Sequence, residues 1–387
     1  MKKILIVTDI SLSKDYHAGN KNALLSLCEY FYYHGSYEVE ILNFHFSRPE
    51  KKLLNKFNIY HYPDIINLMY RKIFQILNFN LKLSSYKKSI FRKFILKFLF
   101  KKKYDLIIIE YLENHHLINE CKKLSPTIIC DLHDIMYLRR ESFLSTTGIP
   151  KSENLNITLH DEINLINKFD AVLAIEKSEK EFLMNNNVIP TIIHCKRTLF
   201  KNNNLSIITP SLSVFKIGFI GSAAEFNFST ISYFIENIWN KYLYNKNITL
   251  ILAGEICRAV IEKKINIYGS YEILGRVSDI SEFYSAIHLS INPVLSGSGF
   301  KTKNAESLSF GVPIVTSENG IKGFEKIDKD YCKLVTSDNN INEWYDHLND
   351  IYNNYKNNHK LKLECLNNFN FNFNTEDNFQ ELEGYLK

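Results

Sequence analysis

Residues 291–316 read INPVLSGSGFKTKNAESLSFGVPIVT, and the rest of the chain can be interpreted outward from this stretch. A short apolar run is followed by a glycine-rich turn at 297–299, by Lys301 and Lys303, and by a second apolar run. Glycines let backbone N–H groups approach an anion, a helix N-terminus favours negative charge, and lysines neutralise it. The pattern predicts a strand, a phosphate-binding turn, a helix and a strand. An ordinary βαβ connection with solvated lysines has the same pattern, and at this point it stays open.

Short apolar runs alternate with predicted helices on both sides of this stretch. The predicted strands are Ile4–Val7, Val39–Leu42, Leu106–Ile109, Thr127–Cys130, Ala171–Ile175, Lys216–Ile220, Thr249–Leu252 and Tyr271–Leu274. Continuous apolar strands bounded by polar residues are typical of parallel sheets covered on both faces. We therefore expect an α/β protein with two Rossmann-like domains and with ligand sites at the carboxyl ends of its strands.

The chain length and composition suggest where the domains divide. A chain of 387 residues corresponds to two or three domains. We expect an N-terminal domain at 1–205, a C-terminal domain at 206–370 and a closing helix at 371–387. The segment 200–213 is rich in Asn, Ser and Thr, which is typical of a linker. The closing helix is predicted from a stripe formed by Phe379, Leu382 and Leu386.

The composition is that of a globular protein, with 45% apolar and 23% charged residues. No run of 18 apolar residues occurs, so we expect no membrane-spanning helix. The N-terminal MKKILIVTDI has too short an apolar core for a signal peptide and reads as a buried first strand. The seven cysteines are scattered and form no CxxC, which argues against a disulfide framework and a structural zinc site. We expect a cytoplasmic protein.

The positive charge is concentrated in residues 71–103, which hold eleven Lys or Arg and no Asp or Glu. Apolar residues recur there at helical spacing, as in Ile73, Phe94 and Phe98. A basic amphipathic helix can lie on an anionic membrane surface, so we expect peripheral association with the inner face of a membrane. A core-facing helix with solvated lysines is the alternative. No nucleic-acid-binding module accompanies the charge, so we expect no nucleic acid partner.

Four segments of the second half resemble retaining GT-B glycosyltransferases of family 4. They are GFIGS at 218–222, LAGE at 252–255, LGRV at 274–277 and the longer GSGFKTKNAESLSFGVPIVTSENGIKGF at 297–324. The first half matches more loosely, through Gly19 and through DLHD at 131–134. The resemblance implies a GT-B fold, in which two Rossmann-like domains face each other across a cleft. It also implies a C-terminal helix that returns to the N-terminal domain.

The resemblance also implies roles for individual residues. Glu306 would accept hydrogen bonds from both ribose hydroxyls, because an ionised carboxylate can take two donors at once. The expected catalytic residues are Lys301 and Arg276 at the diphosphate and His133 at the donor sugar. The expected donor-binding residues are Gly19, Gly221, Ser222, Val277, Gly297, Ser298, Gly299, Phe300, Lys303 and Glu306.

One position departs from the family pattern. The family often carries two glutamates separated by seven residues, and Ser298 stands where the first of them would be. A hydroxyl can still bind a sugar, but the identity of the donor sugar cannot be carried over from the family.

The expected reaction is transfer of a sugar from a nucleotide diphosphate sugar to an acceptor hydroxyl, with retention and without a metal or other cofactor. We expect a glycan or lipid-linked acceptor in the synthesis of bacterial surface polysaccharide. A GT-B sugar-nucleotide epimerase is an alternative, and it would turn over the donor without an acceptor. A catalytically silent relative acting as a membrane-associated partner in glycan assembly is another. A dehydrogenase is disfavoured because the first βα loop lacks G-x-G-x-x-G.

Overall fold

The computed structural model divides the chain into two units. The residues that it describes are all except 15, 17–18, 35, 77–88, 147, 151–155, 197–213, 325–331, 337–340, 358–360 and 373–374. The N-terminal unit comprises Met1–Glu141, Lys151–Thr198 and Thr375–Lys387, and the C-terminal unit comprises Ser142–Pro150 and Leu199–Asn374. The predicted linker at 200–213 lies outside the described residues.

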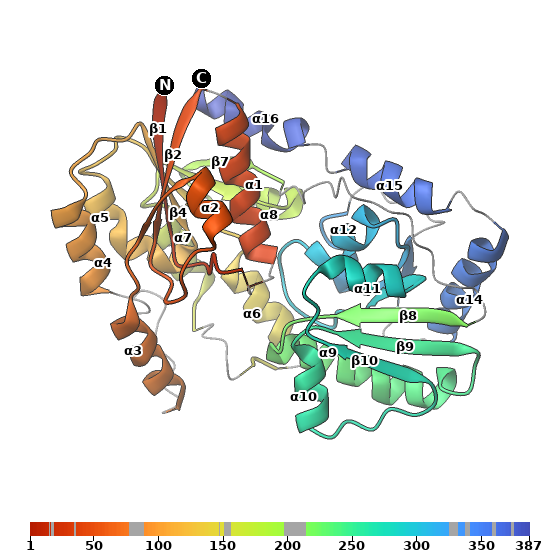
Figure 1. The fold of residues 1–387 in the computed structure, drawn as a ribbon. Coiled ribbons are helices and arrows are strands. Elements are labelled where there is room, and N and C mark those ends of the chain that lie inside the picture. Colours follow the sequence, from red (N-terminus) through yellow and green to blue (C-terminus); the bar gives the residue numbers. More distant parts are fainter. Residues whose placement is uncertain are drawn as a thin grey trace. The chain divides into compact units, whose positions relative to one another are not determined.

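A seven-stranded parallel sheet forms the centre of the N-terminal unit (Figure 1), with the order β3-β2-β1-β4-β5-β6-β7. Its strands are β1 Lys2–Thr8, β2 Tyr37–Asn43, β3 Asn58–His61, β4 Leu106–Glu110, β5 Ile128–Asp131, β6 Ala171–Ala174 and β7 Thr191–His194. In chain order, strands are added on one side of β1 as far as β3 and on its other side from β4 onward, so the strand order reverses between β1 and β4. Open α/β sheets bind ligands outside the carboxyl ends of the strands at such a reversal.

Helices cover both faces of this sheet. They are α1 Gly19–Tyr33, α2 Lys51–Lys56, α3 Ile65–Ile76, α4 Ile90–Phe94, η2 Ile95–Leu99, η3 Leu112–Leu117, α5 Ile118–Cys121, α6 Met136–Leu144 (which begins in this unit), α7 Leu159–Ile166, α8 Lys177–Asn185 and α16 Thr375–Leu386. The strands are buried because they are continuously apolar, and Leu5, Ile6 and Ile108 have no exposed surface.

The closing helix α16 belongs to the N-terminal unit, which confirms the predicted return of the chain. Phe379 is fully buried and stacks on Tyr30 of α1, with ring centroids 4.3 Å apart. Glu381 accepts hydrogen bonds from the Lys180 ammonium at 2.8 Å and from the His194 N–H at 2.7 Å. Apolar packing on α1, an ion pair with α8 and a hydrogen bond to β7 therefore attach α16 to the N-terminal unit.

A six-stranded parallel sheet forms the centre of the C-terminal unit, with the order β10-β9-β8-β11-β12-β13. Its strands are β8 Phe215–Ile220, β9 Ile248–Ala253, β10 Tyr271–Gly275, β11 Leu289–Asn292, β12 Ile314–Ser317 and β13 Cys332–Val335. Its helices are α9 Glu225–Phe234, η4 Ile235–Leu243, α10 Ile256–Glu262, α11 Ile280–Ala286, α12 Thr302–Ser309, α13 Glu318–Ile321, α14 Ile341–Asn357 and α15 Leu361–Asn372. Here the strand order reverses between β8 and β11.

The eight strands predicted from apolar runs are all present, and the two-domain α/β fold class is confirmed. The sequence did not predict β3, β7 and β13, all of which lie at sheet edges. An edge strand is covered less completely, and β3 and β7 are largely half-exposed or exposed, so neither needs a continuous apolar run. Among the described residues, no helix is both long enough and apolar enough to cross a bilayer.

Candidate active site

The two loops at the strand reversal of the C-terminal unit carry most of the residues singled out by the sequence. Gly221 and Ser222 follow β8, and the turn 297–299 and α12 follow the neighbouring strand β11. Since the carboxyl ends of parallel strands lie at one edge of a sheet, the two loops adjoin although they are about 75 residues apart in the chain.

Lys303, on the first turn of α12, reaches the loop that follows β8. Its ammonium donates to Oδ1 of Asn227 at 2.6 Å and lies 4.5 Å from the centre of the Phe219 ring. A Cβ atom added to Gly221 would lie 3.5 Å from this ammonium, so the Lys303 Nζ atom is directly beside the Gly221 backbone. Burial lowers the pKa of Lys303 from 10.5 to about 8, while the Glu306 carboxylate opposes the drop and Lys301 adds to it. The ammonium of Lys303 therefore lies beside the loop, and a bound anion would stabilise its charged form in addition to Glu306.

Asn227, near the start of α9, holds this loop in place. Its side-chain amide donates to the Ser222 carbonyl at 3.2 Å and to the Ser222 hydroxyl at 2.9 Å. The Gly221 carbonyl accepts from the Ile256 N–H at 3.0 Å. Gly254 has φ +89°, and a Cβ atom there would lie only 2.4 Å from the Gly221 oxygen. A glycine is therefore required at 254 for the loop to approach so closely.

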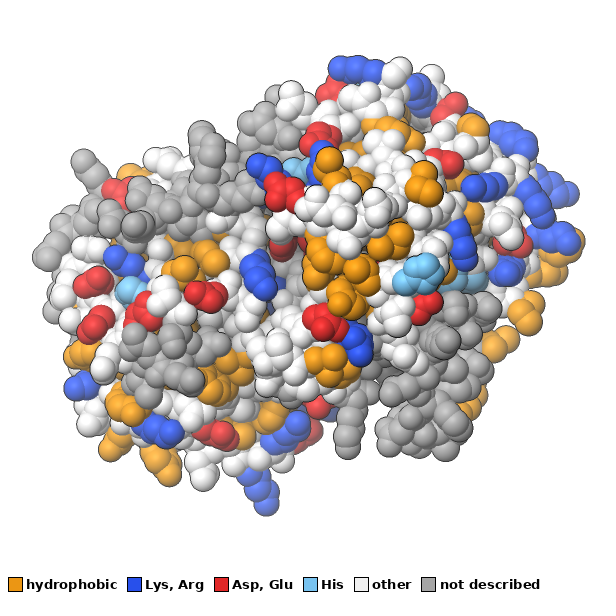
Figure 2. Space-filling view, turned by 180° about the vertical axis from the view of Figure 1, so that it is seen from behind, with side chains coloured by type: hydrophobic (Ala, Val, Ile, Leu, Met, Phe, Trp, Pro, Cys, Tyr) orange, Lys and Arg blue, Asp and Glu red, His pale blue; other side chains and the backbone are white. Residues whose placement is uncertain are grey.

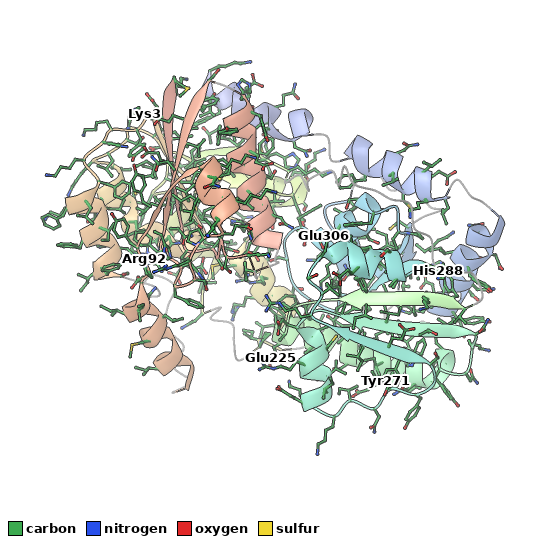
Figure 3. All side chains as sticks on the ribbon, viewed as in Figure 1. Lys3, Arg92, Glu225, Tyr271, His288 and Glu306 are labelled. Atoms are coloured by element: carbon green, nitrogen blue, oxygen red, sulfur yellow. The ribbon has the colours of Figure 1, made fainter. Side chains whose placement is uncertain are left out.

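Glu306 lies one turn after Lys303 on α12 and is half-buried (Figure 3). Burial, followed by the charge of Glu306, raises the pKa of Tyr284 on the adjoining helix α11. The Tyr284 hydroxyl donates to the Lys303 carbonyl at 3.4 Å, and its ring stacks on Phe310 at 4.7 Å. Helix α12 is thus held by α11, and it places a carboxylate and an ammonium on the same side.

Lys301 makes contacts of a different kind. Its ammonium donates to the carbonyls of Ser298 at 2.9 Å and Gly299 at 2.8 Å, so it binds the turn that precedes its own helix. Gly297 has φ +113° and Gly299 has φ +76°, conformations that glycine adopts readily. Phe300 is half-buried and stacks on Phe324 at 5.2 Å, which anchors the turn to the core of the unit.

Arg276 and Val277 follow β10 at the same edge of the sheet. Arg276 lies 3.6 Å from Glu255, which follows β9, and about half of each side chain is exposed. An ion pair in this setting is weakly held, so the Arg276 guanidinium can change partner at little cost. Val277 is half-buried against the small apolar cluster around Phe283.

His133 in the N-terminal unit lies just beyond the carboxyl end of β5. Its Nε2 atom is 2.5 Å from Oε2 of Glu110, at the end of β4, and 3.9 Å from Oδ2 of Asp131. Its ring stacks on Tyr111 with centroids 4.2 Å apart. Both His133 and Tyr111 have positive φ, of 61° and 64°, which non-glycine residues adopt rarely and which often marks functional sites.

Glu110, Asp131 and His133 each offer a ligand atom, and all three atoms lie within 4.8 Å of one another, a spacing that would suit a metal ion. Two ligand atoms on a zinc ion lie about 3.3 Å apart, given bonds of about 2.0–2.1 Å in a tetrahedron. The 2.5 Å contact between Glu110 and His133 is shorter than that. These two side chains are therefore arranged as a charge-assisted hydrogen bond.

Gly19 is the first residue of α1, and the residue that follows it, Asn20, contacts this group. Asn20 donates from its side-chain amide to the Tyr111 hydroxyl at 3.0 Å, and Tyr111 stacks on His133. The strand reversal between β1 and β4 thus brings Asn20, at the start of α1, and Tyr111, which stacks on His133, together within the N-terminal unit.

Three residues that contact the predicted site residues carry no prediction from the sequence: Asn227, Glu110 and Tyr111. Glu110 directly follows a predicted strand, as Asp131 does, and the two are register partners across β4 and β5. Polar residues at the ends of two successive apolar strands were therefore an available signal. No comparable local signal marks Asn227.

Comparison with known proteins defines the class of fold first. The chain is similar to a TarM variant of S. aureus in complex with Fondaparinux, alpha-GlcNAc-glycerol and UDP, with a TM-score of 0.69, 12% identity and 100% of both chains covered. It is similar to Anabaena HepE in complex with UDP and glucose, with a TM-score of 0.65 and 13% identity over 100% of this chain and 99% of that one. The apo form of the lipopolysaccharide outer core galactosyltransferase WaaB gives a TM-score of 0.59 and 14% identity over 100% and 99%. The chain has the GT-B fold.

The sequence family is indicated by a narrower match. Residues 214–354, all within the C-terminal unit, match the family model described as glycosyl transferases group 1. No curated protein matches the chain. The family match and the GT-B fold together support the group 1 glycosyltransferase family.

Proposed function

We propose that the protein is a retaining glycosyltransferase of family 4, which transfers a sugar from a nucleotide diphosphate sugar to an acceptor hydroxyl. The observation that carries the proposal is the position of Lys303 beside the Gly221 loop, with Glu306 one turn further along α12. A cation beside a glycine loop suits a diphosphate, and a nearby carboxylate suits a ribose. TarM and HepE, which share the fold, are described in complex with UDP.

The hard step in such a transfer is departure of the leaving group, because negative charge develops on the diphosphate as the sugar becomes cationic. Fixed donors aimed at that charge stabilise the transition state, and losing one costs about 3–4 kcal/mol. We assign Lys303 as the principal cation, since Lys301 already binds two carbonyls of its own turn. Lys301 then orders the turn 297–299 and supplies a second positive charge. Arg276 exchanges Glu255 for phosphate.

The remaining contacts follow the family resemblance. Glu306 accepts from the two ribose hydroxyls, Val277 lies against the base, and Ser222 adds a hydroxyl at the phosphates. His133 contacts the donor sugar, with its imidazole oriented by Glu110. The departing phosphate takes the acceptor proton as the acceptor attacks from the same face. This route needs neither a separate base nor a metal ion.

We place the reaction in the synthesis of a bacterial surface polysaccharide or a lipid-linked glycan. WaaB, which has the same fold, is a lipopolysaccharide outer core galactosyltransferase, and TarM is described in complex with alpha-GlcNAc-glycerol. Ser298, in the turn after β11, would face the sugar and is the position at which donor choice should be examined.

A thermal-shift panel tests the donor site directly, with UDP, GDP, ADP and CMP alone and as sugar conjugates. One nucleoside diphosphate should raise the melting temperature. Lys303→Ala and Glu306→Ala should each remove that shift. Lys241→Ala is the matched control, because Lys241 is an exposed lysine of the same unit that contacts Asn237. If no nucleotide changes the melting temperature of the wild-type protein, the donor site is assigned wrongly.

A transfer assay with the donor identified in this way tests the reaction class. The anomeric configuration of the product, read by NMR, should match that of the donor, and EDTA should leave the rate unchanged. Inversion would overturn retention, and loss of activity in EDTA that a divalent cation restores would overturn metal independence. Conversion of the donor into an epimer without any acceptor would assign the protein to the epimerases instead.

A further inference from the structure

Helix α3 of the N-terminal unit has four apolar side chains that are exposed on one face. Ile65, Ile66, Met69 and Ile73 are all exposed, with Ile66 at 73%. At 3.6 residues per turn these four positions fall within an arc of about 100°. Asn67, on the other side of the helix, is buried. A helix at the surface of a soluble protein ordinarily buries its apolar face and exposes its polar face. The exposed apolar face of α3 therefore indicates a partner.

The helical segment formed by α4 and η2 repeats this arrangement. Ile90 is 87% exposed, and Phe94, Phe98 and Leu99 are each about half exposed, at intervals that place them along one stripe. The Phe94 and Phe98 rings pack against each other with centroids 4.7 Å apart. Ile95 and Leu96 occupy the opposite side and are buried in the unit. The segment therefore has one set of apolar side chains that packs into the core and a second apolar stripe that is exposed to solvent.

The exposed stripe is bordered by lysines. Lys97 and Lys101 are exposed and Lys93 is half-buried, and residues 90–103 contain no Asp or Glu. The Lys97 ammonium lies 5.0 Å from the centre of the Phe98 ring, so the charge and the apolar surface are adjacent. Figure 2, which shows the side opposite to that of Figure 1, has hydrophobic and Lys or Arg side chains next to each other at its right-hand edge.

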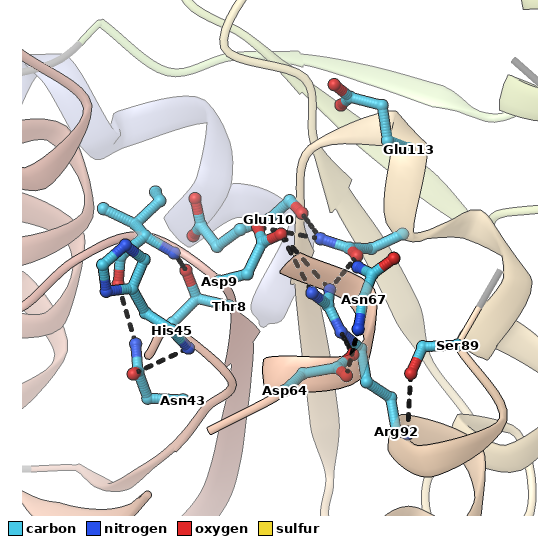
Figure 4. Close-up of polar contacts among 12 residues, drawn as sticks. Thr8, Asp9, Asn43, His45, Asp64, Asn67, Ser89, Arg92, Glu110 and Glu113 are labelled. Carbon is cyan, nitrogen blue, oxygen red and sulfur yellow. Dashed lines mark hydrogen bonds and ion pairs between the residues drawn. The ribbon is translucent and has the colours of Figure 1, made fainter. Parts of the chain in front are cut away.

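The buried side chain of Arg92 joins the two helical segments to the sheet (Figure 4). Its guanidinium donates to Asp64 at 2.8 Å, to Asn114 at 2.7 Å and to Asp9 at 3.2 Å, and only 3% of the side chain is exposed. Asp64 in turn accepts from the Asn67 N–H at 3.1 Å and so caps the first turn of α3. Arg92 lies in α4, so one buried ion pair fixes the start of α3 against α4 (Figure 3).

We propose that the exposed faces of α3 and of the α4–η2 segment form one docking surface for an anionic lipid membrane. Aromatic and aliphatic side chains enter the boundary between headgroups and acyl chains, while lysines bind headgroup phosphates with their stems along the apolar surface. The buried Arg92 network keeps the two faces fixed, so that the surface is formed before it meets the bilayer.

Charge complementarity selects lipid over a second copy of the chain. A twofold interface is isologous, so the same lysine-bordered patch of both copies would be brought together. No Asp or Glu lies within residues 90–103 to offset that repulsion. An anionic lipid surface supplies the opposite charge at every position.

Co-sedimentation with vesicles tests the proposal, using phosphatidylcholine alone and an equal mixture with phosphatidylglycerol. The protein should bind the mixed vesicles at low salt, bind phosphatidylcholine weakly, and dissociate at high salt. The double variant Phe94→Ser/Phe98→Ser should bind at least tenfold more weakly, because two aromatic rings no longer enter the lipid. Loss of one surface cation weakens binding about fivefold, so Lys93→Glu/Lys97→Glu should reduce it by more than tenfold.

Two control variants each place one Ser or Glu at an exposed apolar or lysine position elsewhere on the N-terminal unit. Ile189 is 83% exposed and Lys177 of α8 is exposed, so Ile189→Ser and Lys177→Glu should bind as the wild-type protein does. Each variant is first checked for an unchanged melting temperature.

Four results would overturn the proposal. They are absence of binding to mixed vesicles at low salt, equal binding to both vesicle types, equal losses in the control variants, and self-association without lipid that Phe94→Ser/Phe98→Ser abolishes. The last result would assign the surface to a second copy of the chain.

Discussion

Binding of the donor should weaken as the pH rises through about 8, because Lys303 then loses its charge. Burial lowers the pKa of this ammonium to about 8 from 10.5. With a pKa of about 8 the charged fraction is about 0.97 at pH 6.5 and about 0.24 at pH 8.5. If the diphosphate binds only the ammonium form, the dissociation constant rises about fourfold across this range, or about 0.8 kcal/mol. A lysine with the ordinary pKa would give no measurable change.

Titration calorimetry with the intact nucleotide sugar is the suitable measurement. Both of its phosphates are esterified, so the diphosphate keeps a constant charge over this range, whereas the terminal phosphate of a free nucleoside diphosphate titrates near pH 6–7. Binding at pH 8.5 should also take up a proton, since the bound anion raises the pKa of Lys303. That uptake is read from the dependence of the enthalpy on the buffer.

Two variants separate charge from position. Lys303→Arg keeps its charge throughout the range, so its affinity should be lower than that of the wild-type protein but independent of pH. Lys303→Ala should bind at least tenfold more weakly at pH 6.5 and show no slope. The reasoning is refuted if wild-type affinity is flat between pH 6.5 and 8.5 while Lys303→Ala binds normally.

Three further predictions concern the frame around the two sites. Arg92→Met should reduce the free energy of unfolding, measured by urea denaturation, by about 3–5 kcal/mol, since it leaves the buried Asp64 unpaired; a loss below about 1 kcal/mol would contradict this. Gly254→Ala should lower the free energy of unfolding by more than about 2 kcal/mol, because the added Cβ would lie 2.4 Å from a backbone oxygen. Gly384→Ala in helix α16, where no atom lies within 4 Å of the added Cβ, should instead raise the free energy of unfolding by about 0.5–1 kcal/mol. Equal effects of the two substitutions would count against the close approach at Gly254. Burial raises the pKa of Glu162 from 4.5 to about 7. Between these two pH values the carboxyl is therefore protonated in the folded state and ionised in the unfolded state. Stability from Glu162 is therefore present below pH 4.5 and lost as the pH rises through 7, and Glu162→Gln should show a smaller fall over that interval than the wild-type protein; an unchanged pH profile would disprove it.

The sequence predicted those parts of the fold that depend on residues adjacent in the chain. Continuous apolar runs such as Leu106–Ile109 are needed only by strands covered on both faces, and every such run became a strand. The edge strands β3 and β7 are half-exposed, so their sequences carry a weaker signal. The predicted phosphate-binding turn could be singled out because its glycines and lysines, Gly297 to Lys303, lie close together in the chain.

Residues that act through packing could not be predicted in the same way. Asn227 and Lys303 are 76 residues apart, and their contact exists only because β8 and β11 are neighbours in the sheet. Glu110 and His133 meet because β4 and β5 pair in parallel with Glu110 opposite Asp131. The order of strands in a sheet is a long-range property, and no spacing within either segment encodes it.

The basic region shows a second limit of sequence reasoning. Helical periodicity indicates that a segment has an apolar face, but it does not indicate what that face touches. In the α4–η2 segment, Ile95 and Leu96 meet the core while Phe94 and Phe98 meet solvent. Residues 77–88 of the predicted basic region lie outside the described residues, so the docking surface rests on the two segments that flank them.

The ranking of the two lysines at α12 follows from what each ammonium contacts. Lys301 is the N-cap of α12, with non-helical φ −86° and ψ 78°, whereas Lys303 lies in the first turn of the helix. Lys303 reaches Asn227 near the start of α9, while Lys301 turns back to the carbonyls of Ser298 and Gly299. Both lysines would be needed for binding, but for different reasons. Lys301→Ala should weaken binding by loosening the turn and should leave the pH dependence intact, whereas only a change at Lys303 should remove it.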